Sequence, residues 1–148
     1  MKRWISTVIY TAVAIFLSFN TAYADQVAGT IKTVKGDVNI VRAGSAIKAA
    51  NRMKLNASDK VVTGVNSSIG IILLDDTLIA FGSETVSTLD KFRYDPVKRD
   101  GNLLISMLKG SMRFVTGWLG KRRPEFVAIN LPAATIGVRG TDFIVSVE

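Results

Sequence analysis

Hydrophobic and polar residues alternate with a period of two along most of this chain. Residues 27–34 (VAGTIKTV) show the pattern first, and 38–42 (VNIVR) repeat it after a Gly36-Asp37 turn. A period of two is that of a β-strand with one face in a core and the other in solvent. The further strands that we expect, rich in β-branched residues and bounded by Asp, Asn, Gly or Ser, are 60–63, 69–74, 77–81, 84–89, 126–129 and 142–147.

Helical periodicity is not sustained in any of these segments. The strongest candidate for a helix is 102–109 (NLLISMLK), but periodicity cannot separate a short helix from a buried strand in so short a run. We interpret 103–109 and 111–116 as two strands around Gly110. The pair Asp75-Asp76 predicts a solvated hairpin turn rather than a calcium site, which needs more oxygen ligands. The stretches expected to be irregular are 43–58, with a weak strand near 52–55, 94–101 and 117–125.

These short strands predict an all-β fold in one domain. Several turns precede an alternating strand, as in Gly36-Asp37-Val38 and in Lys109-Gly110-Ser111. This irregular recurrence favours a coiled, solenoid-like stack of short strands, in which each turn of chain buries its face on the next. A β-sandwich is the alternative architecture.

The first 24 residues have the layout of a cleaved secretory signal peptide. Lys2 and Arg3 precede an apolar run, and Ala22 and Ala24 are the small residues that a signal peptidase reads. Cleavage after Ala24 leaves a domain of residues 25–148 that is periplasmic or secreted and has no stable transmembrane anchor. The alternative is an uncleaved anchor, but the apolar run is short against the roughly 20 residues of a bilayer crossing.

The composition restricts the chemistry of this domain. The chain has no cysteine and no histidine, which excludes disulfides, Ser-His-Asp triads, Cys-His pairs and histidine-containing metal sites. Lysine-based or paired-carboxylate catalysis stays open, but Ser67-Ser68 near Lys60 lacks the Ser-x-x-Lys spacing of a hydrolase. We therefore predict a non-enzymatic binding module with no cofactor and no metal. The net charge of +7 favours anionic envelope polymers or lipid headgroups, and export argues against nucleic acid.

A motif near the end of the chain, PAATIGVRGTDF at 132–143, contains two glycines in the pattern Gly137-x-x-Gly140. It lacks the spacing of a phosphate loop and the third glycine of a dinucleotide fingerprint. We expect a sharp corner between strands, with positive φ or close backbone approach at both glycines. Thr141 and Asp142 are expected to cap the amides that this corner frees.

Arg139, between the two glycines, has two interpretations. As a structural guanidinium it would bond backbone carbonyls or pair with Asp142 or Asp76, because its planar fork makes several bonds at once. As a functional residue it would anchor a ligand. The structural interpretation is favoured, because a corner arginine between apolar strands usually satisfies its own fold.

The same motif, from Pro132 to Phe143, closely resembles the end motif of FecR-type domains, which are named for the periplasmic iron-dicitrate sensor protein. Weaker similarities are GDVNIVR at 36–42, DKVVTGVNSS at 59–68, LLDDTLI at 73–79 and LKGSMRF at 108–114. The resemblance covers about 27–147 and implies an all-β, coiled domain without cofactor or catalytic residues. Leu131 stands where the family often has threonine.

The resemblance also sets an expectation about signalling. Complete sensor proteins of this type carry a cytoplasmic anti-sigma segment and a transmembrane helix before the domain, and a small domain after it. This chain starts with a signal-like segment and ends just past the motif, so the sigma-regulating role is not expected to carry over. We predict instead an interaction module of the cell envelope, whose exposed strand edges accept a protein partner in signalling or scaffolding.

The densest positive charge lies at 117–125, in Lys121, Arg122 and Arg123 beside Trp118. An aromatic ring next to clustered cations offers stacking and charge to an anionic glycan or lipid phosphate. A solvated loop with a partly packed tryptophan is the simpler interpretation, because most charge runs are solvated surface. These four residues are the predicted contact site, and the sequence leaves the oligomeric state open.

Overall fold

The structure, a computed structural model, describes residues 26–140 and 142–148. Nearly all of the regular structure in these residues is β-strand. The predicted signal peptide and Thr141 lie outside the described residues. The elements are β1 Val27–Lys35, β2 Val38–Arg42, β3 Ser45–Lys48, β4 Lys54–Asn56, β5 Lys60–Thr63, β6 Ser68–Leu73, β7 Leu78–Phe81, β8 Val86–Asp95, β9 Asp100–Val115, α2 Trp118–Arg122, η1 Pro124–Phe126, β10 Val127–Leu131, β11 Ala134–Gly137 and β12 Asp142–Val147.

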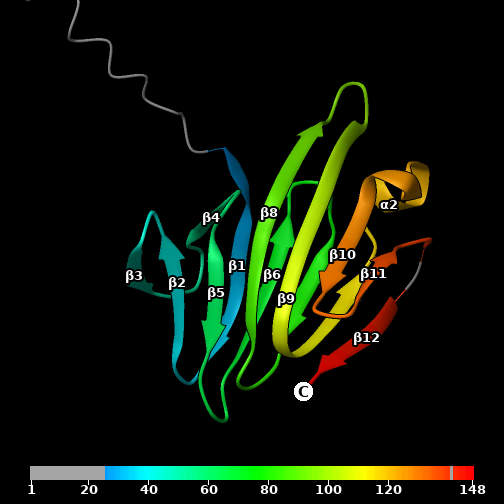
Figure 1. Ribbon diagram of the computed structural model, residues 1–148. Coiled ribbons are helices and arrows are strands. Elements are labelled where there is room, and N and C mark those ends of the chain that lie inside the picture. Colours follow the sequence, from blue (N-terminus) through cyan, green and yellow to red (C-terminus); the bar gives the residue numbers. More distant parts are fainter. Residues whose placement is uncertain (1–25, 141) are drawn as a thin grey trace, which may run out of the picture.

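The strands form one curled sheet, in the order β3-β2-β5-β8-β9-β7-β6-β1-β4 (Figure 1). The long strand β9 organises it, because its first part pairs with β8 and β10 and its last part pairs with β7 and β12. All pairings are antiparallel except that of β9 with β10. The predicted all-β fold in a single domain is thus confirmed, as one sheet that curls around its own core.

The core lies between the two halves of this curled sheet. Alternate residues of the strands point inward, as Ile69, Ile71 and Leu73 do in β6. A small internal cavity is lined from both halves, by residues such as Ile71 and Phe81 on one side and Leu89 and Ile105 on the other. The period of two in the sequence therefore places one face of each central strand in the core.

Gly110 marks the point at which β9 passes from one half of the sheet to the other. Lys109 pairs with Val86 of β8, and Gly110 pairs with Val147 of β12. Gly110 has φ of +100°, and a Cβ atom there would overlap Thr85. The Thr85 hydroxyl accepts a hydrogen bond from the Ser111 amide at 3.1 Å. The prediction of two strands separated at Gly110 is therefore wrong, because the glycine bends one continuous strand.

The GDV segment at 36–38 and the TGVNSS segment at 63–68 are distant in sequence but pack together. The amide of Asp37 donates to the Ser67 hydroxyl at 2.8 Å, and the Gly64 amide donates to the Asp37 carbonyl at 2.8 Å. Gly36 has φ of +74°, and a side chain there would overlap Ser67. The GDV and TGVNSS segments therefore form one structural corner, and their residues are explained by packing.

The acidic hairpin turn lies where it was predicted, between β6 and β7, but only one of its two aspartates is solvated. Asp75 is fully buried, while its neighbour Asp76 is exposed. The Asp75 carboxylate accepts hydrogen bonds from the hydroxyl of Thr77 at 2.7 Å and from the amide of Leu119 at 3.3 Å. The Asp75 carbonyl accepts the Trp118 amide at 2.7 Å. Asp76 is therefore solvated as predicted, whereas Asp75 is buried and holds the start of α2 against the sheet.

Three stretches expected to be irregular contain regular structure. The 43–58 stretch contains β3 and β4, and the 94–101 stretch is the tip of a long β8–β9 hairpin whose strands reach Asp95 and Asp100. The 117–125 stretch contains α2 and most of η1. The helix escapes sequence prediction because its five residues are too few for periodicity and its anchor, Asp75, is distant in the chain.

Candidate interaction surfaces

The end motif forms the connection between β11 and β12. Gly140 has φ of +59°, the left-handed backbone expected of a corner glycine, and its side-chain position faces open space. Gly137 lies at the end of β11 with no atom near its side-chain position and without a positive φ. The expectation of a constrained backbone at both glycines is therefore wrong for Gly137. Pro132 lies in the turn between β10 and β11.

Arg139 does not make the contacts expected of a structural guanidinium. It is exposed, and its side chain makes no hydrogen bond or ion pair with any residue that the structure describes. Asp142, its expected partner, is bound by Arg113 of β9 instead. Arg139 lies at a shallow hollow of about 450 Å³ whose other residues include Glu125 and Val138.

The Arg113–Asp142 pair joins β12 to β9. Arg113 Nε donates to Asp142 Oδ1 at 2.9 Å, and the guanidinium also bonds the second carboxylate oxygen. The hydrogen bond and the charge of Arg113 lower the pKa of Asp142 below its ordinary value of 3.8. The carboxylate therefore stays ionised at neutral pH. Both oxygens of Asp142 bond Arg113, and the capping of corner amides by Thr141 and Asp142 stays a prediction, because Thr141 lies outside the described residues.

β12 is an edge strand of the sheet. Among the described strands it pairs with β9 alone, in unbroken register from Asp142 to Val147. Phe143 packs inward, 5.4 Å from the ring of Phe114, whereas Ile144 points outward and is 71% exposed. β12 has six residues, which makes it the longest edge strand that the structure describes. The other edge strands, β3, β4 and β11, have four residues or fewer.

An apolar depression of about 260 Å³ lies on the outer face of the same half of the sheet. Leu78 and Ala80 of β7 and Val115 of β9 line it, with Lys32 and Arg113 among its other residues. Ile144 is the register partner of Arg113. The outward side chain of Ile144 thus lies next to the apolar depression, which has Lys32 and Arg113 at its border.

The predicted contact site at 118–123 is on α2 and the residue after it. Lys121 and Arg122 are exposed, and their side chains make no hydrogen bond or ion pair with the described residues. Arg123 bonds Glu125 at 3.0 Å and lies 4.9 Å from the Phe126 ring. Trp118 is half exposed, and the guanidinium of Arg99 lies 4.9 Å from its ring. The structure therefore adds Arg99 to the predicted group.

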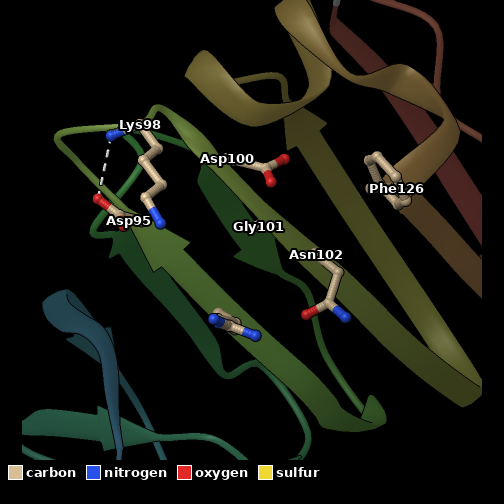
Figure 2. A pocket seen from close by; sticks show the side chains of 7 residues that line it. Asp95, Lys98, Asp100, Gly101, Asn102 and Phe126 are labelled. Carbon is tan, nitrogen blue, oxygen red and sulfur yellow. Dashed lines mark hydrogen bonds between the residues drawn. The ribbon is translucent and has the colours of Figure 1, made fainter.

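A pocket of about 220 Å³ lies between the β8–β9 hairpin tip and η1. Figure 2 shows Asp95 and Lys98 at the tip, Phe126 on η1, and Asp100 and Asn102 between them. The backbone amide of Lys98, more than any other group, lowers the pKa of Asp95 below its ordinary value. Charges of both signs line the pocket, and all of its side chains are at least partly exposed.

The sequence patterns did not point to three residues of these candidate surfaces, Ile144, Val97 and Arg99. The strand 142–147 was predicted, and its alternation puts Ile144 on the face of Asp142 and Ser146, opposite the inward Phe143. The alternation of this strand was therefore enough to predict that Ile144 is exposed. Arg99 had no such signal, because its contact with Trp118 depends on how the hairpin tip lies against α2.

The fold and these surfaces define a small all-β domain with an open strand edge and an apolar, cation-bearing surface. A family model described as FecR protein matches residues 59–148, and the chain belongs to this family. Searches of curated proteins and of solved structures found no match. The FecR family is envelope-associated and regulatory, and it is not known for catalysis. Neither helix in the described residues is long and apolar enough to cross a bilayer.

Proposed function

We propose that this protein is an exported, non-enzymatic interaction module of the cell envelope, which binds a protein partner in envelope signalling or scaffolding at the free edge of β12. The observation that carries the proposal is the open six-residue edge of β12, with Ile144 exposed beside it. Membership in an envelope-associated regulatory family supports the setting.

The edge of β12 lacks the features that usually prevent strand pairing. Natural edge strands are blunted by lysine, proline, bulges or short length. β12 contains no lysine and no proline, and its register with β9 has no bulge. By contrast, β3 ends in Lys48 and β4 begins with Lys54. A partner strand on β12 would extend the sheet through backbone hydrogen bonds.

The outer face beside this edge offers selectivity for such a strand. In strand addition, alternate side chains of the incoming segment contact the receiving face. Here they would meet Ile144 and the apolar depression formed by Leu78 and Val115. Lys32 lies beside the depression, whereas Arg113 is already paired with Asp142. An incoming strand with apolar residues and an acidic residue that reaches Lys32 therefore fits best.

The test places a photo-crosslinking residue at position 144 or, as control, at position 65 in the full chain expressed in its own cell type. Val65 is 69% exposed, close to the 71% of Ile144, but it lies in the turn after β5. We expect position 144 to crosslink a single protein in near-stoichiometric yield and position 65 to give none.

A purified partner then tests the edge directly. Ile144→Lys, which adds an edge charge, should weaken binding at least tenfold, whereas Val65→Lys should leave it unchanged. Equal crosslinking at both positions, or binding that survives Ile144→Lys, would disprove a β12 docking site. Circular dichroism of each variant checks that the sheet is intact.

A further inference from the structure

One end of the molecule combines exposed apolar side chains with an excess of cations. Val97, in the tip of the β8–β9 hairpin, is 90% exposed, and Trp118 of α2 and Phe126 of η1 are 44% and 41% exposed. Segments 93–100 and 118–126 together hold six lysines and arginines against three carboxylates. We call these two segments the hairpin–helix end.

Contacts between the two segments make the hairpin–helix end one surface. The guanidinium of Arg99, at the hairpin tip, lies 4.9 Å from the ring of Trp118. Lys98 and Phe126 line the same pocket between tip and η1 (Figure 2). A ligand that covers the tip would therefore also meet α2 and its cations, Lys121 and Arg122.

The hairpin tip is held in its conformation by hydrogen bonds of its own. The carboxylate of Asp95 accepts the amides of Val97 at 2.9 Å and of Lys98 at 3.0 Å. The tip therefore presents Val97 in an ordered turn. Burying this side chain on binding does not require a loop to be ordered first, which lowers the cost of association.

From this surface we infer that the hairpin–helix end docks on an anionic lipid bilayer. Val97, Trp118 and Phe126 would enter the interface, while Lys98, Arg99, Lys121 and Arg122 contact the lipid phosphates. Exposed aromatic and aliphatic residues surrounded by cations are what surface-bound proteins present to anionic membranes. The inference is independent of the proposed β12 edge, because it uses different residues.

A lipid surface fits better than an anionic polysaccharide, the other polyanion of an envelope. A polysaccharide uses aromatic rings as stacking platforms, but Arg99 already lies over the ring of Trp118. A polysaccharide also offers little apolar surface to an isolated valine, whereas burial of the Val97 side chain in hydrocarbon is favourable. Val97, which is 90% exposed, would therefore contribute to binding a bilayer but not to binding a polysaccharide.

The experiment uses the full chain with Trp4→Phe, so that the emission of Trp118 alone is observed; the chain has two tryptophans. Vesicles of phosphatidylcholine with about a third phosphatidylglycerol are compared with pure phosphatidylcholine. We expect a blue shift of Trp118 and its quenching by brominated lipid with the anionic vesicles only, weakened by added salt. Because the readout is at Trp118, binding through the N-terminal apolar segment that leaves Trp118 in water gives no blue shift.

Two variants and a matched control locate the contact. Replacing Lys121 and Arg122 by glutamine should weaken partitioning roughly 25-fold, about fivefold for each cation. Val97→Asp should weaken it at least tenfold. Val65→Asp should have no effect, because β5 runs antiparallel to β8 and Val65 follows its end, away from the hairpin tip.

Three results would overturn the inference. One is the same Trp118 emission with anionic and with neutral vesicles. Another is a loss of binding in Val65→Asp equal to that in Val97→Asp. The third is a Trp118 response to a soluble anionic polysaccharide as large as that to anionic vesicles and insensitive to Val97→Asp, which would assign the surface to a polymer. The comparison of anionic with neutral vesicles uses no variant of the hairpin–helix end. The inference can therefore be disproved even if one of the surface variants fails to fold.

Discussion

At the scale of single residues, the glycines of the end motif differ in what they require. Gly140 needs a left-handed backbone, which L-residues with branched side chains avoid. Gly137 needs neither unusual dihedral angles nor close approach. Arg139 projects between them without a partner among the described residues. A motif that reads as one unit in the sequence therefore contains positions with separate physical roles.

The first prediction compares Gly140→Val with Gly137→Val. Both positions face open space, so neither valine meets a steric overlap. Gly140→Val should lower the free energy of unfolding by about 1–3 kcal/mol, because valine must adopt a positive φ. Gly137→Val should change it little, since valine suits the extended backbone of β11. Urea unfolding measures both, and equal losses would show that the backbone at Gly140 is not the cause.

At the scale of elements, α2 depends on a residue that is 44 positions away. The carboxylate of Asp75 accepts the Leu119 amide, and the Asp75 carbonyl accepts the Trp118 amide. Gly117 is required beside them, because a side chain there would overlap the Asp75 turn. A five-residue helix cannot persist alone. The β6–β7 turn therefore sets where Trp118 and the cations of α2 lie.

The second prediction tests this anchor with Asp75→Asn and its neighbour Asp76→Asn. Asp75→Asn places an amide donor among the donors from Thr77 and Leu119, and should cost about 1–3 kcal/mol of unfolding free energy. Asp76→Asn should be nearly neutral, because Asp76 is exposed and asparagine tolerates its positive φ. The two values come from urea unfolding, and a neutral Asp75→Asn would contradict the anchoring role.

The elements also show what the sequence could predict and what it could not. Alternation located most strands, since their burial follows the period of two, as in β6. It could not predict that β9 continues through Gly110, because the bend depends on Thr85, the residue before β8. It could not predict α2, whose anchor is distant. The end motif identified the family correctly, but the partner of Asp142, Arg113, comes from a strand pairing that no local pattern encodes.

At the scale of the whole molecule, the folded state favours the ionised form of several carboxyl groups. The chain has 19 lysines and arginines against 12 acidic residues, a net charge of +7. Among the described residues, three carboxyls on the surface have pKa values below their ordinary value: Asp37, mainly through its bond to Lys48; Asp95, mainly through the Lys98 amide; and Asp142, mainly through Arg113. Acid therefore removes attractive contacts and raises the positive charge together.

The third prediction is the pH dependence that follows. A carboxyl whose pKa is depressed by folding stabilises the protein above its unfolded-state pKa, and this contribution is lost as pH falls through the folded-state pKa. The free energy of unfolding should therefore vary little near neutral pH and fall as the pH drops below about 4. In Asp142→Asn the loss between pH 5 and pH 2 should be smaller than in the parent chain, because one of the titrating contacts is already absent. Urea unfolding at these pH values measures the difference, and equal losses would mean that the Arg113–Asp142 pair contributes nothing to acid sensitivity.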